Sequence, residues 1–135
     1  MSDIDRRLCL ATGTASGLGR ALALGLARQG WRMVLLARDP IRGEAALAAV
    51  RQAGAPKTEL LLCDLSDLSS IRRAAAELSS HHTHLHLLLN CAAVYRAKRE
   101  RTADGLEAMF ATNHLGPFLL TSLPSNTGMQ LGAGR

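Results

Sequence analysis

A glycine-rich turn close to the amino terminus is the first segment whose residue types and spacing could do chemistry. It spans residues 12–19 with the pattern Thr-Gly-x-x-x-Gly-x-Gly, between an apolar run at 8–11 and a stretch of helical periodicity. Backbone N–H groups at the start of a helix can hold a pyrophosphate. Gly13 permits the tight turn, Gly17 lets phosphates approach the backbone, and Gly19 lets the helix pack closely on the strand. The alternative is an ordinary strand-to-helix connection; a P-loop is excluded because no Gly-Lys-Ser/Thr follows.

The elements that must position this turn alternate regularly. Apolar runs typical of buried strands are separated by segments with helical spacing, two of which end at Gly30 and Gly54. Parallel strands need crossover connections, and right-handed crossovers place helices outside the sheet. The pattern predicts an α/β fold of the Rossmann type, a doubly wound parallel sheet with helices on both faces, truncated to about four strands. The expected strands are 8–11, 32–37, 59–63 and 85–89, and the expected helices are 18–29, 40–53, 68–78 and 104–120.

Length and composition fit such a unit. The chain has 135 residues, 47% of them hydrophobic, which is enough to bury a core and excludes a wholly disordered chain. Sixteen Lys and Arg against 11 Asp and Glu give a net charge of +5, which suits an anionic ligand without demanding nucleic acid. With only 3% aromatic residues, little is left for stacking bases. No run of about 18 apolar residues occurs, so we expect no membrane span.

The cysteines indicate the redox setting. Cys9, Cys63 and Cys91 are odd in number, far apart and outside any Cys-x-x-Cys pair. Neither a disulfide framework nor a zinc site is indicated, and we expect a reducing, cytoplasmic environment.

Several motifs, in order, resemble those of the short-chain dehydrogenase/reductase family. They are the glycine turn, Asp64-Leu65 after the third expected strand, Asn90-Cys91-Ala92-Ala93 after the fourth, and Asn113-His114-Leu115-Gly116 in the last helical segment. The sequences of residues 36–39 and 104–121 are most similar to those of the retinol-dehydrogenase-like and protochlorophyllide-reductase-like branch.

The resemblance covers about residues 6–123, which correspond to the N-terminal half of a typical family domain. We therefore assign residues 1–123 to that half of an NAD(P)-binding Rossmann domain and residues 124–135 to a loose C-terminal tail. Strand 85–89 would then be an exposed, apolar sheet edge, which predicts self-association.

The resemblance implies a site for a nicotinamide cofactor. The glycine turn would hold the pyrophosphate and the adjoining ribose, and Asp64 would accept a hydrogen bond from the adenine amino group beside the Leu65 backbone. The segment after the fourth strand would line the cofactor ribose, where Ala93 adds a Cβ to a position that is Gly in the family. The implied cofactor-binding residues are Gly13, Thr14, Ser16, Gly17, Leu18, Gly19, Arg38, Asp64, Leu65, Asn90, Ala92 and Ala93.

The end of the second strand bears on the choice of cofactor. Relatives that prefer NAD(H) carry an acid that bonds the ribose diol, and this position is Ala37, followed by Arg38. Arginine can grip a 2′-phosphate bidentately, so we expect NADP(H) to be preferred over NAD(H). The alternative is that Arg38 pairs with a surface carboxylate such as Asp39.

Asn113 is the expected catalytic residue, since by resemblance its main-chain carbonyl holds a proton-relay water. Pro117 lies four residues later and lacks the N–H that would bond this carbonyl, which predicts a free acceptor and a local kink. Alternatively, Pro117 ends the helix and Asn113 is a surface residue. The family also uses a Ser and a Tyr-x-x-x-Lys segment. The only tyrosine, Tyr95, precedes Lys98 by three residues and lies upstream of Asn113, so we interpret that pair as a coincidence.

Two further features are assigned no function. The histidines within 81–86 are placed in a loop away from the expected cofactor, and we expect no functional metal site. Residues 96–101 hold four basic side chains and one acid, typical of a solvated loop.

Three functions stay open from the sequence. The first is an NADP(H)-dependent oxidoreductase that acts on a small alcohol or carbonyl, represented here by its cofactor-binding half. The second is an inactive NADP(H)-binding fragment that pairs with a full-length relative. The third is a basic binding protein unrelated to nucleotides, which RNA binding with a steep salt dependence would favour.

Overall fold

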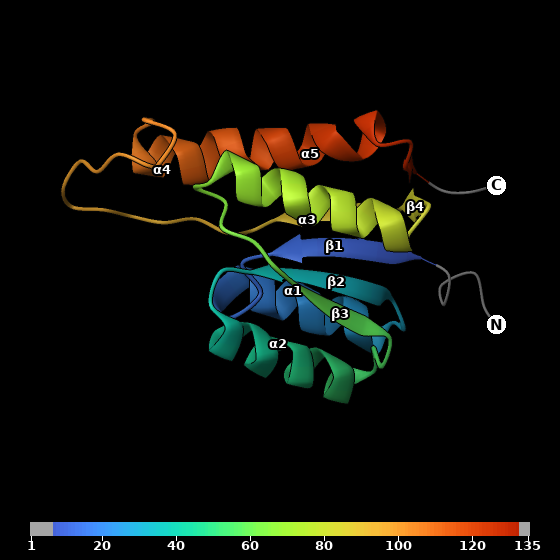
Figure 1. Cartoon of the computed structure of the whole chain (residues 1–135). Helices are drawn as coiled ribbons and strands as arrows, with labels where there is room; N and C mark the ends of the chain where they lie inside the picture. Colours follow the sequence, from blue (N-terminus) through green and yellow to red (C-terminus); the bar gives the residue numbers. More distant parts are fainter. Residues whose placement is uncertain (1–6, 133–135) are drawn as a thin grey trace.

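A four-stranded parallel sheet forms the centre of the protein, whose computed structural model describes residues 7–132 (Figure 1). The strand order is β3-β2-β1-β5, and all three neighbouring pairs are parallel. The strands are β1 (Leu8–Thr12), β2 (Arg32–Ala37), β3 (Thr58–Leu62) and β5 (Leu87–Asn90).

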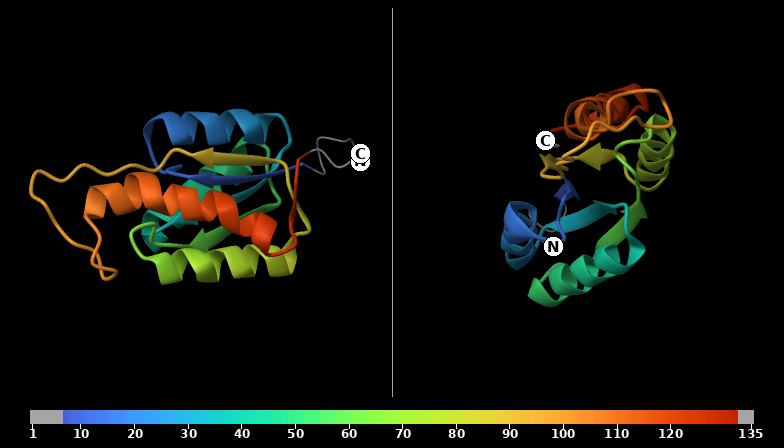
Figure 2. Two further views of the ribbon diagram at one scale, coloured as in Figure 1. Left: turned by 90° about the horizontal axis from the view of Figure 1, so that it is seen from above. Right: turned by 90° about the vertical axis from the view of Figure 1, so that its left-hand side faces the viewer.

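Helices cover both faces of this sheet (Figures 1 and 2). Leu10 and Val34 face the cluster that contains side chains of α3 and α5, whereas Cys9 and Met33 face the cluster with side chains of α1 and α2. This division follows from the strand geometry, in which successive side chains point to opposite faces. The predicted doubly wound α/β architecture is confirmed. The helices are α1 (Gly17–Arg28), α2 (Pro40–Ala53), α3 (Leu68–His81), α4 (Ala108–Phe110), a π-helical turn (Ala111–Leu115) and α5 (Gly116–Asn126).

The strand register brings the predicted site segments to one edge. Thr12, the last residue of β1, is in register with Leu36 of β2 and with Asn90 of β5, and Ala37 is in register with Leu62 of β3. The residues that follow these strands therefore meet at the carboxyl end of the sheet, where doubly wound folds bind their ligands.

The expected strand 85–89 is interrupted at His86. The backbone N–H of His86 donates to the Leu8 carbonyl oxygen at 3.0 Å, and its Nδ1 accepts the Leu8 N–H at 3.1 Å. The side chain of His86 thus occupies the bonding position that a continuous ladder would use. As a result the segment divides into β4 (His84–Leu85) and β5.

The expected helix 104–120 begins later and ends later than predicted. Residues 101–107 form a small hairpin, closed by an antiparallel bridge between Arg101 and Glu107, and the helical run starts at Ala108. The Glu107 side chain caps this run by accepting from the N–H groups of Met109 and Phe110. Helical structure then continues through Asn126.

The segment predicted as a loose tail contains regular elements within its described residues, 124–132. It contains the end of α5 and the short strand β6 (Gln130–Leu131), which pairs in parallel with β4. Sequence reasoning found no strand there because two residues carry no alternation. Residues 133–135 lie outside the described part.

β5 is an outer strand of the four-stranded sheet. Within residues 7–132 it has a sheet neighbour on one side only, as the sequence predicted for this edge. The self-association that we inferred from it stays a prediction. No helix in the described chain is long and apolar enough to span a membrane.

Candidate nucleotide-binding site

The glycine turn connects β1 to α1 and leaves open space beside one of its glycines. Gly13 and Gly17 have φ angles of +67° and +58°, a region that residues with a side chain rarely adopt. A Cβ on Gly13 would lie 2.5 Å from the backbone nitrogen of Ala92, and one on Gly19 would overlap the carbonyl oxygen of Gly13. A Cβ on Gly17 would meet no atom within 4 Å. Gly13 and Gly19 are thus enclosed by the protein, whereas the backbone at Gly17 is open to a ligand.

Thr12 joins the glycine turn to the segment after β5. Its buried hydroxyl accepts the N–H groups of Cys91 at 3.2 Å and Ala92 at 3.1 Å, and it lies 3.4 Å from the Leu89 carbonyl oxygen, to which it can donate. These bonds satisfy backbone donors where the segment leaves the sheet. Sequence reasoning missed this role because the partners are about 80 residues away along the chain.

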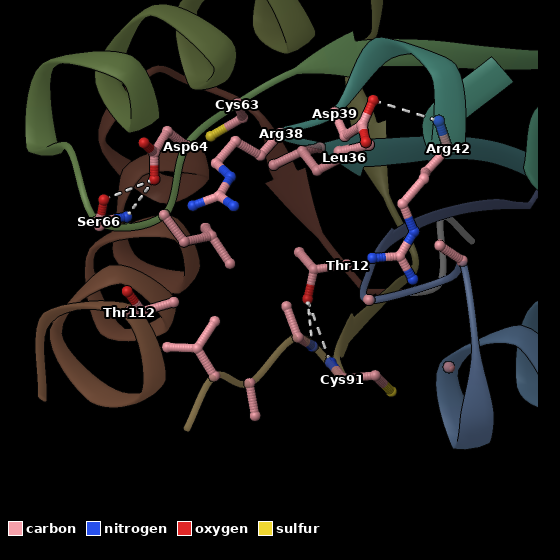
Figure 3. Close-up of a pocket in the computed structure, with 18 of the residues that line it drawn as sticks. Thr12, Leu36, Arg38, Asp39, Arg42, Cys63, Asp64, Ser66, Cys91 and Thr112 are labelled. Atoms are coloured by element: carbon pink, nitrogen blue, oxygen red, sulfur yellow. Dashed lines mark hydrogen bonds between the residues drawn. The ribbon is translucent and has the colours of Figure 1, made fainter. Parts of the chain in front are cut away.

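A cavity of about 560 Å³ extends from the glycine turn across the carboxyl ends of the strands (Figure 3). It has walls from the glycine turn, the end of β2 with the start of α2, the segment after β3 and the connection from β5 to α4. Most predicted site residues line it, namely Gly13, Thr14, Ser16, Gly17, Leu18, Gly19, Arg38, Asp64, Leu65, Ala92 and Ala93.

Two predicted site residues, Asn90 and Asn113, are not in the cavity wall. Asn90 instead donates through Nδ2 to the hydroxyl of Thr121 on α5 at 3.3 Å. Asn113 bonds the backbone of Val94, accepting its N–H at 2.8 Å and donating to its carbonyl oxygen at 2.9 Å. Both asparagines therefore fix neighbouring segments of the protein.

The helix around Asn113 is irregular, as Pro117 predicted. Residues 111–115 form a π-helical turn, in which the Gly116 N–H bonds the carbonyl oxygen of Ala111 five residues earlier. Pro117 has no N–H to give to the Asn113 carbonyl, and the helix continues beyond it instead of ending there.

Two arginines enter the cavity beside the end of β2. Figure 3 shows the side chains of Arg38 and Arg42 directed into it. Asp39 caps α2 by accepting the Ile41 N–H at 2.9 Å and the Arg42 N–H at 3.4 Å. Among the described residues no ion pair joins Arg38 to Asp39, which was the alternative assignment for Arg38. Arg42 was missed by sequence reasoning, although its place in the first turn after Asp39 was a signal.

The segment after β3 places Asp64 in the cavity wall. Its Oδ1 accepts from the backbone N–H of Ser66 at 2.9 Å and from the Ser66 hydroxyl at 2.7 Å, which fixes the carboxylate in the wall (Figure 3). The neighbouring Cys63 thiol also lines the cavity, and burial raises its pKa to about 11. Cys63 therefore stays protonated near neutral pH and is a poor nucleophile.

The histidines within 81–86, which the sequence left without function, do not line the cavity. His81 is the last residue of α3 and not part of a loop, which corrects its placement, and His82 pairs with Glu59 at 3.1 Å. No group of three or more His, Cys, Asp or Glu side chains within residues 7–132 is arranged to hold a metal ion. Tyr95 is 83% exposed and does not line the cavity.

Comparison with known proteins identifies the family. The sequence model for short chain dehydrogenases matches residues 7–135. The chain belongs to the short-chain dehydrogenase family, which uses nicotinamide cofactors, and the resemblance inferred from its motifs is confirmed.

Retinol dehydrogenases are among its relatives. Retinol dehydrogenase 12 of Bos taurus is 40% identical over 119 residues, covering 87% of this chain and 37% of that protein. Retinol dehydrogenase 14 of Mus musculus is 41% identical over 125 residues, covering 84% of this chain and 37% of that protein. The chain thus spans well under half the length of these relatives.

Solved structures share the fold. A metagenomic short-chain oxidoreductase in complex with NADP superposes with a TM-score of 0.77 at 27% identity, covering 93% of this chain and 58% of that one. A short-chain dehydrogenase from Sphingobium yanoikuyae in complex with NADPH gives a TM-score of 0.71 at 28% identity, covering 87% and 46%.

Proposed function

We propose that this chain is the cofactor-binding half of an NADP(H)-dependent oxidoreductase that interconverts an alcohol and a carbonyl compound. The observation that carries the proposal is a single cavity joining the glycine turn to Arg38 and Arg42, with Ala37 at the position where an acid would bond a ribose diol. A carboxylate at residue 37 would repel a 2′-phosphate, whereas two guanidinium groups can bind it.

The residues present fit a dinucleotide. Its pyrophosphate would lie against the open backbone at Gly17 and the start of α1, where N–H groups and the helix dipole favour anions. Asp64 would accept from the adenine amino group, and Ala92 and Ala93 would line the nicotinamide ribose. The complexes with NADP and NADPH formed by two structural neighbours support this assignment.

When bound, the nicotinamide supplies the hydride chemistry. This chain's contribution is to bind and orient it and, through the Asn113 carbonyl, to hold a water that can relay a proton. Pro117 supports the last role because it withdraws the usual donor from that carbonyl. The retinol dehydrogenase relatives favour a lipophilic alcohol or aldehyde as substrate.

A second candidate is an inactive NADP(H)-binding chain that pairs with a full-length relative. It is favoured by the position of Tyr95, the only tyrosine, which is exposed and outside the cavity, so no tyrosine of the described chain faces the expected cofactor. Turnover of NADPH with simple aldehydes or ketones separates the two candidates. Measurable reduction by this chain alone would exclude the inactive alternative. The cytoplasmic setting inferred from the cysteines stays a prediction.

The cofactor assignment is tested by titrating the chain with NADPH and NADH. We expect Arg38→Gln to weaken NADPH binding about tenfold or more and to leave NADH nearly unchanged, because a charge-assisted pair to the 2′-phosphate is lost. Arg20→Gln is the matched control, since Arg20 is exposed on α1 and outside the cavity wall. Equal weakening of both dinucleotides by Arg38→Gln would show that Arg38 does not read the 2′-phosphate.

A further inference from the structure

A second pair of arginines lies in the cavity wall formed by the connection from β5 to α4. Arg96 and Arg101 line this wall, and Glu100 lies between them in the sequence. Sequence reasoning assigned residues 96–101 to a solvated loop. Lys98 and Arg99 fit that description, since both are exposed and neither lines the cavity.

Hydrogen bonds hold this wall in place. The Ala108 N–H donates to the Glu100 carbonyl oxygen at 2.9 Å, and the Thr102 N–H donates to the Leu106 carbonyl oxygen at 2.8 Å. Asp104, at the tip, accepts the Leu68 N–H at 3.1 Å and so attaches the hairpin to the start of α3. Arg101 therefore projects from a segment held in place at both ends.

The side chain of Arg96 has one donor, Nε, that makes no hydrogen bond among the described residues. Its backbone N–H contacts the Met109 sulfur at 3.3 Å, which fixes the main chain. Its side-chain Nε is shielded from solvent and has no hydrogen-bond partner among the described residues. The Glu100 carboxylate forms an ion pair with this nitrogen at 3.7 Å, which is longer than a hydrogen bond. The Arg96 side chain, 40% exposed, thus has Glu100 as a charge partner but keeps one shielded donor without a hydrogen bond. Such a donor in the wall of a cavity favours an anionic ligand.

The charges of the cavity wall depend on this pair. The wall holds four arginines, at 38, 42, 96 and 101, against the carboxylates of Asp39, Asp64 and Glu100. Without Arg96 and Arg101 the carboxylates would outnumber the arginines, and the wall would repel a ligand that carries several phosphate charges. A cleft lined by an excess of one charge raises the local concentration of ligands of the opposite charge.

We propose that Arg96 and Arg101 form a second cationic wall that binds the phosphate groups of the dinucleotide from the side of the β5–α4 connection. This inference rests on the proposed function. It assigns to the loop arginines a role distinct from that of Arg38. They raise affinity for any dinucleotide with a pyrophosphate, whereas Arg38 separates NADPH from NADH.

The test compares two double variants with equal changes in charge. Arg96→Gln/Arg101→Gln removes the cationic wall, and Lys98→Gln/Arg99→Gln removes two exposed charges of the same loop. We measure the dissociation constants of NADPH and NADH by fluorescence titration at low and at moderate ionic strength. We expect the first variant to weaken both dinucleotides about tenfold or more and to lose part of the salt dependence. The control variant stays within about twofold of the parent chain.

The outcomes separate this inference from the proposed function. If the parent chain binds neither dinucleotide, the proposed function fails and this inference with it. If the parent binds and both double variants bind as it does, the inference alone is overturned. Circular dichroism melts report whether the first variant folds. Should it not fold, Arg101→Gln alone serves, because the Arg101 side chain is exposed, and unchanged binding by that variant would likewise overturn the inference.

Discussion

The side-chain amide of Asn113 bonds both backbone polar groups of Val94. The Val94 N–H donates to Oδ1 at 2.8 Å, and Nδ2 donates to the Val94 carbonyl oxygen at 2.9 Å. Ala92 and Ala93, just before Val94, line the cavity. The pair therefore connects the π-helical turn to the wall where a cofactor ribose is expected. An asparagine amide can make both bonds because it offers one acceptor and two donors, whereas a carboxylate only accepts.

Replacing Asn113 is expected to loosen that wall. We expect Asn113→Ala to lower the free energy of unfolding by about 1 kcal/mol or less, because two exposed hydrogen bonds are lost, and to weaken NADPH binding. Asn113→Asp keeps the acceptor but loses the donor, so its effect falls between those of Ala and the parent. Urea unfolding and NADPH titration check both. If Asn113→Ala matched the parent in both measurements, the Val94 bonds would not hold the wall.

The parallel sheet could be predicted because its signal is local. Each strand is a short apolar run, and the first three runs are followed by a recognisable turn or helix start. One example is Asp39-Pro40, where the Asp39 carboxylate caps α2. The start of the last helix could not be predicted in the same way. Asp104 accepts the Leu68 N–H, 36 residues away, and this bond favours a hairpin over helix in residues 104–107.

The residues of the candidate site could likewise be predicted only where the signal is local. The roles of Gly13 and Arg38 could be inferred because the residues next to them indicate a turn after the first strand and the end of the second strand. The hydroxyl of Thr12 bonds Cys91, 79 residues later, and Arg96 lines the cavity from a long connection that Asp104 attaches to the start of α3. Such pairings depend on tertiary packing, which no periodicity encodes.

Thr12 is expected to contribute to stability through the segment after β5. Thr12→Val keeps the buried volume but removes the acceptor for the N–H groups of Cys91 and Ala92. Leaving these partly buried donors without partners lowers the free energy of unfolding by about 1–2 kcal/mol, whereas Thr12→Ser, which keeps the hydroxyl, loses less. Urea denaturation followed by circular dichroism measures both. A valine variant at least as stable as the serine variant would contradict this role.

Gly17 and Gly13 are expected to respond differently to alanine. Gly17→Ala places its Cβ in open space, so the chain folds with a loss of about 1 kcal/mol from the positive φ, while NADPH binding falls because the methyl group occupies the phosphate position. Gly13→Ala places its Cβ 2.5 Å from the Ala92 nitrogen, so this variant is expected to lose stability far more strongly. Thermal melts and NADPH titrations of the two variants make the comparison. Unchanged NADPH affinity in Gly17→Ala would show that phosphates do not approach this backbone.

His86 makes the amino end of the sheet sensitive to acid. Its Nδ1 accepts the Leu8 N–H, so the imidazole must be unprotonated at that nitrogen. Burial, followed by the charges of His84, Arg7 and Arg32, lowers the pKa of His86 below its ordinary value of 6.5. A group whose pKa is lower in the folded than in the unfolded chain favours the neutral form on folding. The stability that it contributes is therefore fully present above pH 6.5 and is lost as the pH falls toward the lowered pKa.

We therefore expect the free energy of unfolding to fall as the pH is lowered from about 7.5 to 5.5. His86→Gln should make this pH dependence smaller, because glutamine does not titrate and can still accept the Leu8 N–H. Urea unfolding at both pH values measures the slope, and amide hydrogen exchange at Leu8 reports the bond itself. If parent and variant had the same pH dependence, the acid sensitivity would not come from His86.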